Sequence, residues 1–421
     1  MINKWQHEQE KVLDEFVSSR LGVVKNLYEL TREPDAPDIF SYVSELCDMT
    51  QFNFQQSGQV STGIGITRFH ARTAAIGEAL ERYAAGLYDQ DEVVLATFRE
   101  MIAKGLPAVH PAEFGLYSEK EHQAYQHLNR FSEDTPIGWT KGISLTDNQA
   151  EAWLPASYVF LPYKYKEGET QISSQISTGL SCAFDRDTAI MGSICEIIER
   201  EAVMLTWLHN LPCTRLTFSK DSWFSQVFEQ RFARSGFEYA LVQAPSDLGL
   251  YTVFALMIDK GRNVVSTGSS TKPDLQQAAL KALLETVQVR ELLQSVPKDR
   301  KPPQFHLEEY QTVPLSDDLH RFFHPDKTFC ADGTEPAVSL EHLLDNCREG
   351  GLDTYMADLT TADLTDAGLH VVRVVMPQTV RLYREFELPY LGGERLFQAP
   401  GKMGFSALSE EKLNLKPHPF G

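Results

Sequence analysis

The chain has 421 residues, with 39 lysines and arginines against 58 aspartates and glutamates, which gives a formal net charge of -19. This negative excess disfavours proteins whose main partner is the phosphate backbone of a nucleic acid. Hydrophobic residues make up 42% and aromatic residues 10% of the chain, enough for a packed core, which excludes the disordered and collagen-like classes.

The first predicted element is a helix over residues 1–32, where apolar residues recur at roughly helical intervals until a Pro-Asp-Ala-Pro cluster at 34–37. The charged N-terminus does not resemble a signal peptide, and no apolar run approaches the ~20 residues of a membrane span. The six cysteines contain no C-x-x-C pair and are expected to be reduced thiols. We therefore expect a cytoplasmic protein that binds neither membranes nor nucleic acids.

Three later segments have clear local patterns. Residues 139–155 predict a β-hairpin, because two strand-like segments flank the polar turn at 146–148. Five prolines lie among charged residues between about 296 and 335, a pattern typical of a surface insertion. The segment LHVVRVVMP at 369–377 predicts a buried strand, and the remaining chain is expected to be rich in loops.

An internal repeat is the most informative feature of the sequence. Three times a β-branched residue is followed by Ser-Thr-Gly, a polar loop and a long apolar helix that carries an acidic or amide pair at i, i+3. The serine precedes the first glutamate by 17 residues in the first copy and by 19 in the others: Ser61 to Glu78, Ser177 to Glu196 and Ser266 to Glu285. Each copy predicts a strand, a small-residue turn and a helix. We expect an α/β fold in which three such units pack around a common centre.

The pairs on the three helices are Glu78/Glu81, Glu196/Glu199 and Glu285/Gln288. Converging carboxylates would repel by roughly 3 kcal/mol per close pair at ~5 Å and an effective dielectric of ~20, so they would need cations. Oxygen ligands at this density suit Mg²⁺, which is normally shared with substrate phosphates, and the Ser-Thr-Gly turns offer donors to phosphate. The competing interpretation is an ordinary solvated helix face in each copy. The threefold recurrence on apolar helices favours a Mg²⁺–nucleotide site.

Other chemical signatures are weak or missing. There is no P-loop and no G-x-G-x-x-G sequence that opens a helix. His320 and His324 have i, i+4 spacing but no acidic third ligand, so we expect a surface pair. Cys195 lies in an apolar helix and is expected to be a core residue rather than a nucleophile.

The three repeats resemble the motifs of the YcaO family. AAIGEALERYAAGLY is similar to the SxxExxER helix of that family, with Ala75 where the family often has serine. STGLSCAFDRDTAIMGSICEIIEREA is similar to its second nucleotide segment, and STGSSTKPDLQQAALKALLETVQVR matches its E-x-x-Q segment. The resemblance runs from about residue 22 to the C-terminus. It implies a YcaO domain over 22–421 after a helical extension at 1–21, with a proline-rich insertion at about 296–335 and a tail at 412–421.

The resemblance also implies an ATP-dependent enzyme that acts on peptide backbone amides. In azoline-forming members, a Cys, Ser or Thr side chain of a ribosomal precursor peptide attacks the preceding carbonyl, ATP phosphorylates the resulting oxyanion, and phosphate leaves with the oxygen. The cofactors would be ATP and Mg²⁺. The implied metal ligands are Glu78, Glu81, Glu196, Glu199 and Glu285. The implied nucleotide-binding residues are Arg82, Ser177, Thr178, Arg200, Glu285 and Gln288.

The C-terminal sequence is similar to the proline-rich tail of the azoline-forming cyclodehydratases. Pro417 and Pro419 match that tail, and Gly421 stands in place of a final proline. In those relatives the tail is thought to deliver the terminal carboxylate to the active site as a base. The competing interpretation is a frayed surface tail.

The implied partners are proteins. No winged-helix-like or Cys-rich segment precedes residue 22, so the resemblance implies a separate, E1-like leader-binding subunit that holds the precursor peptide. It also implies a flavin-dependent azoline dehydrogenase in some systems and a homodimer within a larger complex. Two alternatives stay open: a relative that forms thioamides or amidines, and a non-catalytic docking subunit. Pro417 and Pro419 argue against the thioamide type, and the three intact acid or amide pairs argue against the docking subunit.

Overall fold

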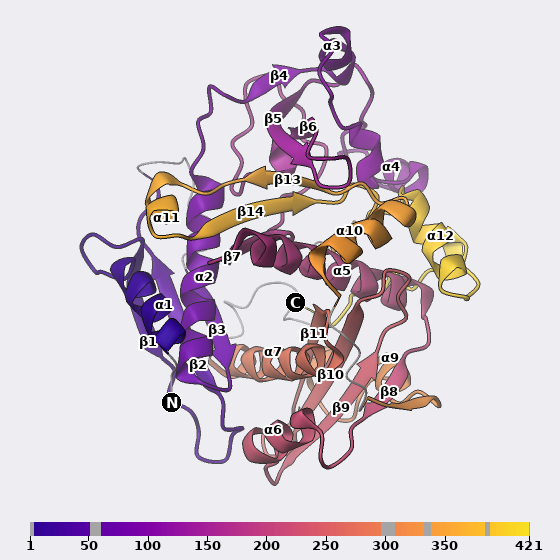
Figure 1. The fold of residues 1–421 in the computed structure, drawn as a ribbon. Helices are drawn as coiled ribbons and strands as arrows, with labels where there is room; N and C mark the ends of the chain where they lie inside the picture. Colours follow the sequence, from indigo (N-terminus) through magenta and orange to yellow (C-terminus); the bar gives the residue numbers. More distant parts are fainter. Residues whose placement is uncertain (1–3, 51–59, 296–307, 332–337, 384–387, 421) are drawn as a thin grey trace.

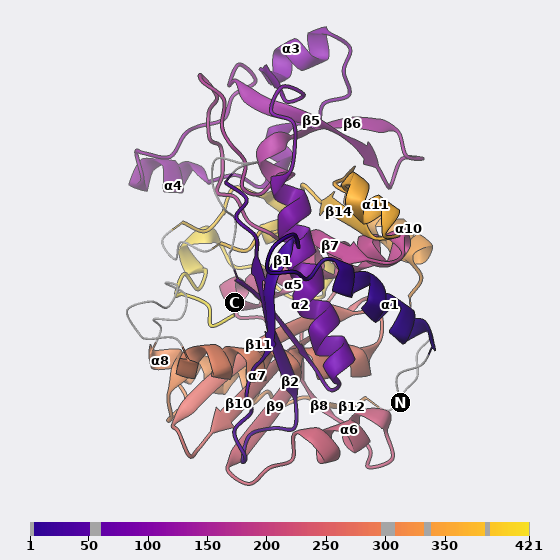
Figure 2. The same cartoon turned by 90° about the vertical axis from the view of Figure 1, so that its left-hand side faces the viewer.

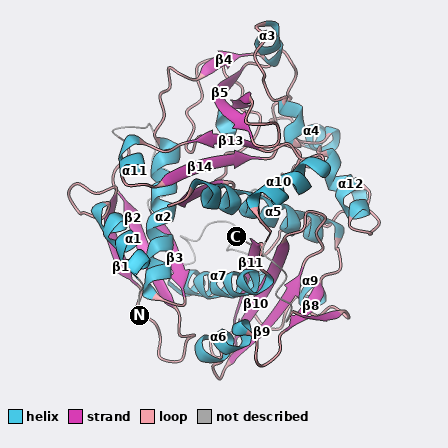
Figure 3. Cartoon of the chain, viewed as in Figure 1, coloured by secondary structure: helices cyan, strands magenta, loops and turns pink. Residues whose placement is uncertain are grey.

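The computed structural model describes residues 4–50, 60–295, 308–331, 338–383 and 388–420. These residues form three β-sheets, of three, six and five strands, with helices between and around them (Figures 1 and 3). Within the same residues, no helix is long and apolar enough to cross a membrane. None of the six cysteines, all of which lie in the described residues, forms a disulfide bond, as the sequence predicts.

The N-terminal sheet is antiparallel and consists of β1 (Val24–Glu29), β2 (Phe40–Leu46) and β3 (Val60–Gly65). Helix α2 (Arg68–Gly86) packs against β2 and β3 and also contacts α1 (Lys4–Glu15) (Figure 2). The prediction of one helix over residues 1–32 is wrong beyond residue 15. Residues 24 and 27, whose spacing suggested a helix, lie in β1, where pairing with β2 outweighs a weak helical periodicity.

The six-stranded sheet, called the hairpin sheet here, lies at one end of the molecule, and the five-stranded sheet, called the meander sheet, lies at the other (Figures 1 and 2). The hairpin sheet has the order β4 (Val94–Ala96), β5 (Ile137–Ser144), β13 (Tyr355–Asp358), β14 (His370–Val375) and β7 (Leu180–Ala183), and β6 (Glu151–Pro155) also pairs with β5. The antiparallel β5–β6 pair confirms the predicted hairpin, and β14 confirms the predicted buried strand. Four short helices belong to this half: α3 (Phe98–Ala103), α4 (Glu119–Ala124), α10 (Leu340–Glu349) and α11 (Ala362–Asp366).

The meander sheet has the order β11 (Val264–Lys272), β10 (Tyr251–Asp259), β9 (Phe237–Gln243), β8 (Thr214–Thr217) and β12 (Thr328–Cys330). Its neighbours are antiparallel except for β12, which runs parallel to β8. Helix α7 (Leu275–Ser295) packs on β10 and β11. Four further helices are α6 (Trp223–Arg231), α8 (Glu308–Gln311), α9 (Asp317–Phe323) and α12 (Glu394–Lys402).

Where the structure describes it, the proline-rich segment is partly exposed and partly packed on the fold. Leu319 and Phe323 on α9 are fully buried in the core cluster that also contains Trp207, and β12 extends the meander sheet. Large apolar side chains therefore anchor this segment despite its many prolines and charges. Residues 296–307 and 332–337 of the predicted insertion lie outside the described residues.

Helix α5 (Arg186–His209) lies between the hairpin and meander sheets and contacts β7, β14 and β11. It starts after Asp185, whose side chain accepts a hydrogen bond from the backbone N–H of Thr188. The helix is apolar on nearly all sides, as expected for a buried helix. Its glutamates at 196 and 199 therefore face the protein interior rather than bulk water.

The strands of the three repeats, β3, β7 and β11, each lie at the edge of a different sheet, and each leads into one of the three long helices. The predicted small-residue turn is wrong in the first and third copies, where Ser-Thr-Gly lies within the strand. A Cβ atom on Gly63 would lie 2.1 Å from the Ala71 oxygen, and one on Gly268 would lie 2.4 Å from the Ala282 oxygen. Glycine therefore lets each helix backbone lie directly on its strand. In the second copy the motif precedes β7, and Gly179 has φ of +89°.

Candidate active site

A cavity of ≈ 360 Å³ lies where α2, α5 and α7 meet, and residues of all three repeats line it. The prediction that the repeats pack around a common centre is confirmed. The acids that line the cavity are Glu78, Glu81, Glu196, Glu199 and Glu285. Its other predicted site residues are Arg82, Ser177, Arg200 and Gln288, and the sequence analysis missed Thr62, Ser269, Thr271, Lys272 and Lys281.

The first acid of each repeat is held by the backbone of its own repeat. The three hydrogen bonds run from Thr62 N to Glu78 at 3.2 Å, from Gly179 N to Glu196 at 3.0 Å, and from Ser269 N to Glu285 at 2.6 Å. The two residues that each bond joins are 16, 17 and 16 positions apart in the three repeats. These separations agree more closely than the offsets of 17, 19 and 19 residues counted from the serines. Each bond fixes one carboxylate oxygen and leaves the other available to the cavity.

The second position of each repeat contacts the strand of the next repeat. Glu81 accepts from Cys182 N at 2.9 Å in the second repeat, and Glu199 accepts from Ser269 Oγ and Thr271 N, both at 2.9 Å, in the third. Gln288 of the third repeat donates its side-chain amide to the Thr62 hydroxyl of the first. These cross-links pass from each repeat to the next and close a ring.

Burial raises the pKa of three of these acids. For Glu81 the pKa lies well above its usual value, because of burial and then of the nearby Glu78 and Glu196 carboxylates. Burial also raises the pKa of Glu199, against the opposing effect of Arg200. Burial and the neighbouring Glu199 raise the pKa of Glu285 to about 7. Carboxyl groups that resist ionisation in this way are those that a bound cation would stabilise.

Four cationic side chains also line the cavity. Arg82 lies 3.4 Å from Glu78, and Arg200 lies 3.9 Å from both Glu196 and Glu199. Burial and the nearby Lys272 lower the pKa of Lys281. The Arg82–Glu78 pair does have the i, i+4 geometry of an ordinary surface pair, but its setting in a shared cavity contradicts the solvated-face interpretation. The repeat pattern does not predict Lys272 and Lys281, because only the third copy contains these lysines.

In the described part of the chain, no three Asp, Glu, His or Cys side chains converge closely enough to hold a metal ion by themselves. The carboxylates instead stand around the cavity wall, each tied to a donor of the protein. This oxygen-only set fits a Mg²⁺ ion that shares its coordination with phosphate oxygens and water, better than an ion enclosed by protein alone.

Thr178, which was predicted at the phosphate turn, does not line the acidic cavity. It lines a smaller neighbouring cavity, and Arg200 lines both cavities. The change of direction at the left-handed Gly179 separates Thr178 from Ser177, which does line the acidic cavity. Two further predictions are confirmed. His320 and His324 form an exposed, stacked pair with ring centroids 4.5 Å apart. Cys195 is buried in the core, where burial raises the pKa of its thiol to about 11, and it also lines the acidic cavity.

The C-terminal tail lies against the fold. Trp207 Nε1 donates to the Lys416 carbonyl at 2.7 Å, and Thr267 Oγ1 donates to the Pro419 carbonyl at 2.6 Å. Phe420 is 2% exposed and packs against the ring of Phe254. The frayed-tail interpretation is therefore wrong for residues up to 420, whereas Gly421 lies outside the described residues.

The tail reaches the repeats through Thr267, the threonine of the third Ser-Thr-Gly motif. Pro417 and Pro419 do not line the acidic cavity itself. Between them, His418 donates from Nε2 to the Tyr383 carbonyl at 3.2 Å, and burial lowers its pKa to about 4. The described tail thus ends beside β11, the strand that supplies Ser269 and Thr271 to the cavity.

A family model described as "YcaO cyclodehydratase, ATP- and Mg²⁺-binding" matches residues 62–380. The chain belongs to the YcaO family. ATP and Mg²⁺ are accordingly its cofactors, in agreement with the oxygen-rich cavity that the three repeats enclose.

Solved YcaO structures share this fold. A heterocyclase in complex with substrate and cofactor has a TM-score of 0.81 and 23% identity over 99% of this chain and 57% of its own. YcaO from Methanopyrus kandleri, bound with AMPPCP and Mg²⁺, has a TM-score of 0.63 and 21% identity over 88% of this chain and 91% of its own. An uncharacterized protein of Methanothermobacter thermautotrophicus is 29% identical over 76% of this chain and 82% of its own. The chain spans little more than half the length of the heterocyclase.

Proposed function

We propose that this YcaO protein catalyses the ATP-dependent cyclodehydration of Cys, Ser or Thr residues in a ribosomal precursor peptide to thiazolines or oxazolines. The observation that carries the proposal is the closed ring of repeats around one cavity, with five carboxylates and four cationic side chains on its wall. Such a wall suits a nucleotide triphosphate that binds with Mg²⁺. The docked tail beside the same ring favours the azoline-forming branch of the family.

The roles of the wall residues follow from their chemistry. The carboxylates that would hold Mg²⁺ are those of Glu78, Glu81, Glu196, Glu199 and Glu285. Mg²⁺–ATP, when bound, would supply the phosphoryl group that makes the amide oxygen a leaving group. The residues that donate to phosphate oxygens are Arg82, Arg200, Lys272, Lys281 and Ser177. Gln288 acts indirectly, because its side-chain amide links α7 to β3 and so positions Glu285. Thr178 has no such role, because it faces the neighbouring cavity.

The tail supplies the base in this proposal. Pro417 and Pro419 restrict φ to about -65°, and the bond from Thr267 to the Pro419 carbonyl fixes the tail on β11. The Gly421 carboxylate takes the proton of the attacking thiol or hydroxyl. A new C–S or C–O bond then closes the ring. The former amide oxygen departs with phosphate, and the amide nitrogen gives up its proton as the C=N bond of the ring forms. The net change in the peptide is the loss of one water for each ring.

The peptide partner is a precursor held by a separate, E1-like leader-binding subunit, and a flavin-dependent dehydrogenase oxidises azolines in a later step. The YcaO chain acts as a homodimer within this larger complex. A heterocyclase with a similar fold was solved in complex with substrate and cofactor, which supports a substrate-binding role for the same architecture.

The experiment combines the chain with its leader-binding subunit, a precursor peptide whose core contains cysteines but no serine or threonine, ATP and Mg²⁺, and follows the peptide by mass spectrometry. Loss of one water per ring, with loss of thiol alkylation and one phosphate released per ring, would support azoline formation. Replacement of oxygen by sulfur would instead identify a thioamide-forming enzyme. Water loss with all cysteine thiols still alkylated would point to amidine formation, and an unchanged peptide with no ATP turnover would indicate a docking subunit.

A further inference from the structure

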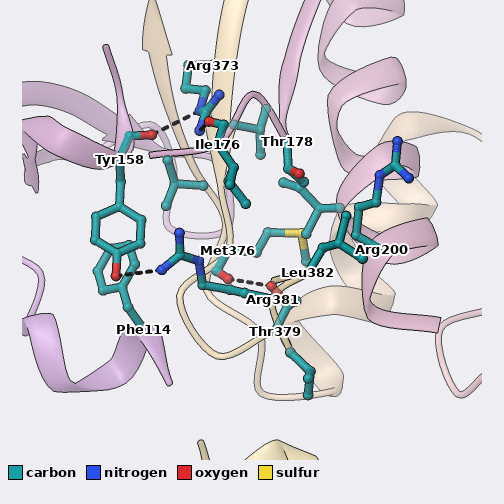
Figure 4. A pocket seen from close by; sticks show the side chains of 14 residues that line it. Phe114, Tyr158, Ile176, Thr178, Arg200, Arg373, Met376, Thr379, Arg381 and Leu382 are labelled. Atoms are coloured by element: carbon teal, nitrogen blue, oxygen red, sulfur yellow. Dashed lines mark hydrogen bonds between the residues drawn. The ribbon is translucent and has the colours of Figure 1, made fainter. Parts of the chain in front are cut away.

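A second cavity, of ≈ 50 Å³, lies next to the acidic one and shares Arg200 with it. Its polar wall comes from Tyr158, Thr178, Arg373 and Arg381, and most of the remaining wall is apolar (Figure 4). Among the described residues, no acidic side chain lines it. The cavity is therefore positive and apolar, whereas its neighbour is rich in carboxylates.

Arg373 lies on β14 and is only 4% exposed. Its Nε donates to the Tyr158 carbonyl at 2.9 Å, and its Nη2 donates to the Ile176 carbonyl at 2.8 Å. Its Nη1 has no hydrogen-bond partner among the described residues. A buried guanidinium donor without an acceptor is costly, so this nitrogen points to a group that binds from outside.

Other buried arginines of this protein are neutralised. Arg290 lies 2.8 Å from Asp259, and Arg395 lies 2.8 Å from Glu201. Arg373, in contrast, forms no ion pair with any acid of the described chain, and burial lowers its pKa to about 9 while Glu196 opposes that effect. A buried cation normally requires a closely paired anion. The described structure therefore leaves a position beside Arg373 for an anion that binds from outside.

Arg381 is held rigidly beside the same cavity. Its guanidinium carbon lies 4.4 Å from the ring centre of Tyr158 and 4.7 Å from that of Tyr390. Its Nη1 donates to the Tyr158 hydroxyl at 2.9 Å, and its Nη2 donates to the Ser174 carbonyl at 3.2 Å. These contacts orient the positive group without neutralising it.

We propose that this cavity binds a small oxyanion, a carboxylate of the peptide substrate, through the Arg373 and Arg381 guanidinium groups. The identity of the substrate rests on the proposed function, whereas the oxyanion site rests on the arginines alone. One water needs about 10–15 Å³ of such space, so the cavity takes a group of about three to five heavy atoms, the size of a carboxylate with its neighbouring carbons. The apolar wall suits the methylene groups of an acidic side chain. Because Arg200 lines both cavities, a carboxylate bound here places the peptide beside the nucleotide.

The test uses the full chain saturated with Mg²⁺ and AMPPCP, so that the nucleotide cavity is filled. Its melting temperature is measured against increasing N-acetyl-aspartate and, separately, inorganic phosphate. N-acetyl-aspartate should raise the melting temperature of the wild type. Arg373→Lys should weaken its apparent affinity by about tenfold or more, because charge-assisted bonds are lost. Arg373 also supports two backbone carbonyls, so Arg381→Gln provides a second variant with the same expected loss.

The matched control is Arg262→Gln, because Arg262 lies 2.9 Å from Glu33 on the surface and should not contribute to an anion site. A shift that persists unchanged in both cavity variants, or no shift in the wild type, overturns the proposal. A shift with phosphate but not with N-acetyl-aspartate also overturns it and identifies a site for released phosphate. A variant-sensitive shift with N-acetyl-aspartate, in a chain that cyclises no peptide, supports the oxyanion site and contradicts the proposed function instead.

Discussion

The side-chain amide of Gln288 donates a hydrogen bond to the hydroxyl of Thr62, although the two residues lie 226 positions apart in the chain. The backbone N–H of Thr62 donates to Glu78, so Thr62 contacts the first and the third repeat at once. The amide at 288 donates to a hydroxyl that can also accept. This bond closes the ring of repeats.

A double-mutant cycle tests the closure of this ring. Thr62→Val removes only the hydroxyl, and Gln288→Leu removes only the amide at nearly constant volume. We expect a coupling free energy of about 1 kcal/mol between the two changes in urea unfolding. Each single change removes the same partly buried hydrogen bond, so the double variant does not lose it a second time. Each single variant should also bind Mg²⁺–ATP more weakly, since α7 is no longer tied to β3. Additive losses of stability would show that the two side chains do not interact.

Much of the site could be predicted from the sequence because its information is local. The i, i+3 spacing of Glu196 and Glu199 places both on one face of a helix, and the threefold repeat indicates that such faces meet. The ring closure could not be predicted, because it joins the edges of three separate sheets. Lys272 and Lys281 were missed for a related reason, since they occur in one repeat only and carry no pattern of their own.

The arginine cavity shows the same limit more strongly. Arg373 appears in the sequence as one charge within a buried strand, and nothing nearby in the chain identifies Tyr158 as its neighbour. The error over residues 24–27 is of the opposite kind, because weak helical spacing suggested an element that strand pairing overrides. Local patterns thus located the acids, whereas tertiary contacts determine what faces them.

Two neighbouring glutamates on α5 should respond oppositely to the same substitution. Glu199 lines the cavity, so Glu199→Gln should keep or raise the melting temperature and abolish ATP turnover, with Glu196→Gln equally inactive. Glu201 lies 2.8 Å from Arg395, and neither residue lines that cavity. Glu201→Gln should therefore destabilise the fold by roughly 3 kcal/mol and leave the turnover of folded molecules nearly intact.

The measurements are calorimetric melting and phosphate release per folded molecule, with Glu201→Gln as the structural control. Full ATP turnover in Glu199→Gln or Glu196→Gln would remove that residue from the metal site. A strong loss of stability in Glu199→Gln would assign the residue to the fold instead.

Stability without nucleotide should fall as the pH rises. The pKa of Glu285 is raised from 4.5 to about 7 in the folded state, so folding retains a proton that the unfolded chain releases. The associated stabilisation is complete below about pH 4.5 and is lost as the pH rises through about 7. The melting temperature should decrease over this interval, and Glu285→Gln should flatten the decrease.

Mg²⁺ with AMPPCP should reverse this trend, because the metal binds ionised carboxylates and so stabilises more strongly at the alkaline end. Melting curves at several pH values, with and without the nucleotide and metal, provide the measurement. An equal slope in the wild type and Glu285→Gln would mean that other groups control the pH dependence.

The last prediction concerns the tail, whose described end is part of the core. Deleting residues 417–421 would remove Phe420, which is 2% exposed, and the loss of a buried phenylalanine costs about 3–5 kcal/mol. A deletion would therefore confuse folding with catalysis. A short extension after Gly421 leaves the contacts of Pro419 and Phe420 in place and moves only the carboxylate, so it isolates the proposed base.

We expect such an extension to reduce ring formation by about 100-fold or more while Mg²⁺–ATP affinity changes little, because removing a positioned base costs about 10²–10⁴ in rate. Thr267→Val, which removes the donor to the Pro419 carbonyl, should produce a smaller loss of the same kind. The control is the same extension at the N-terminus, with peptide mass and nucleotide binding measured in parallel. Full-rate cyclisation by the extended chain would place the base elsewhere, and a parallel loss of nucleotide binding would make the tail a packing element of the nucleotide cavity.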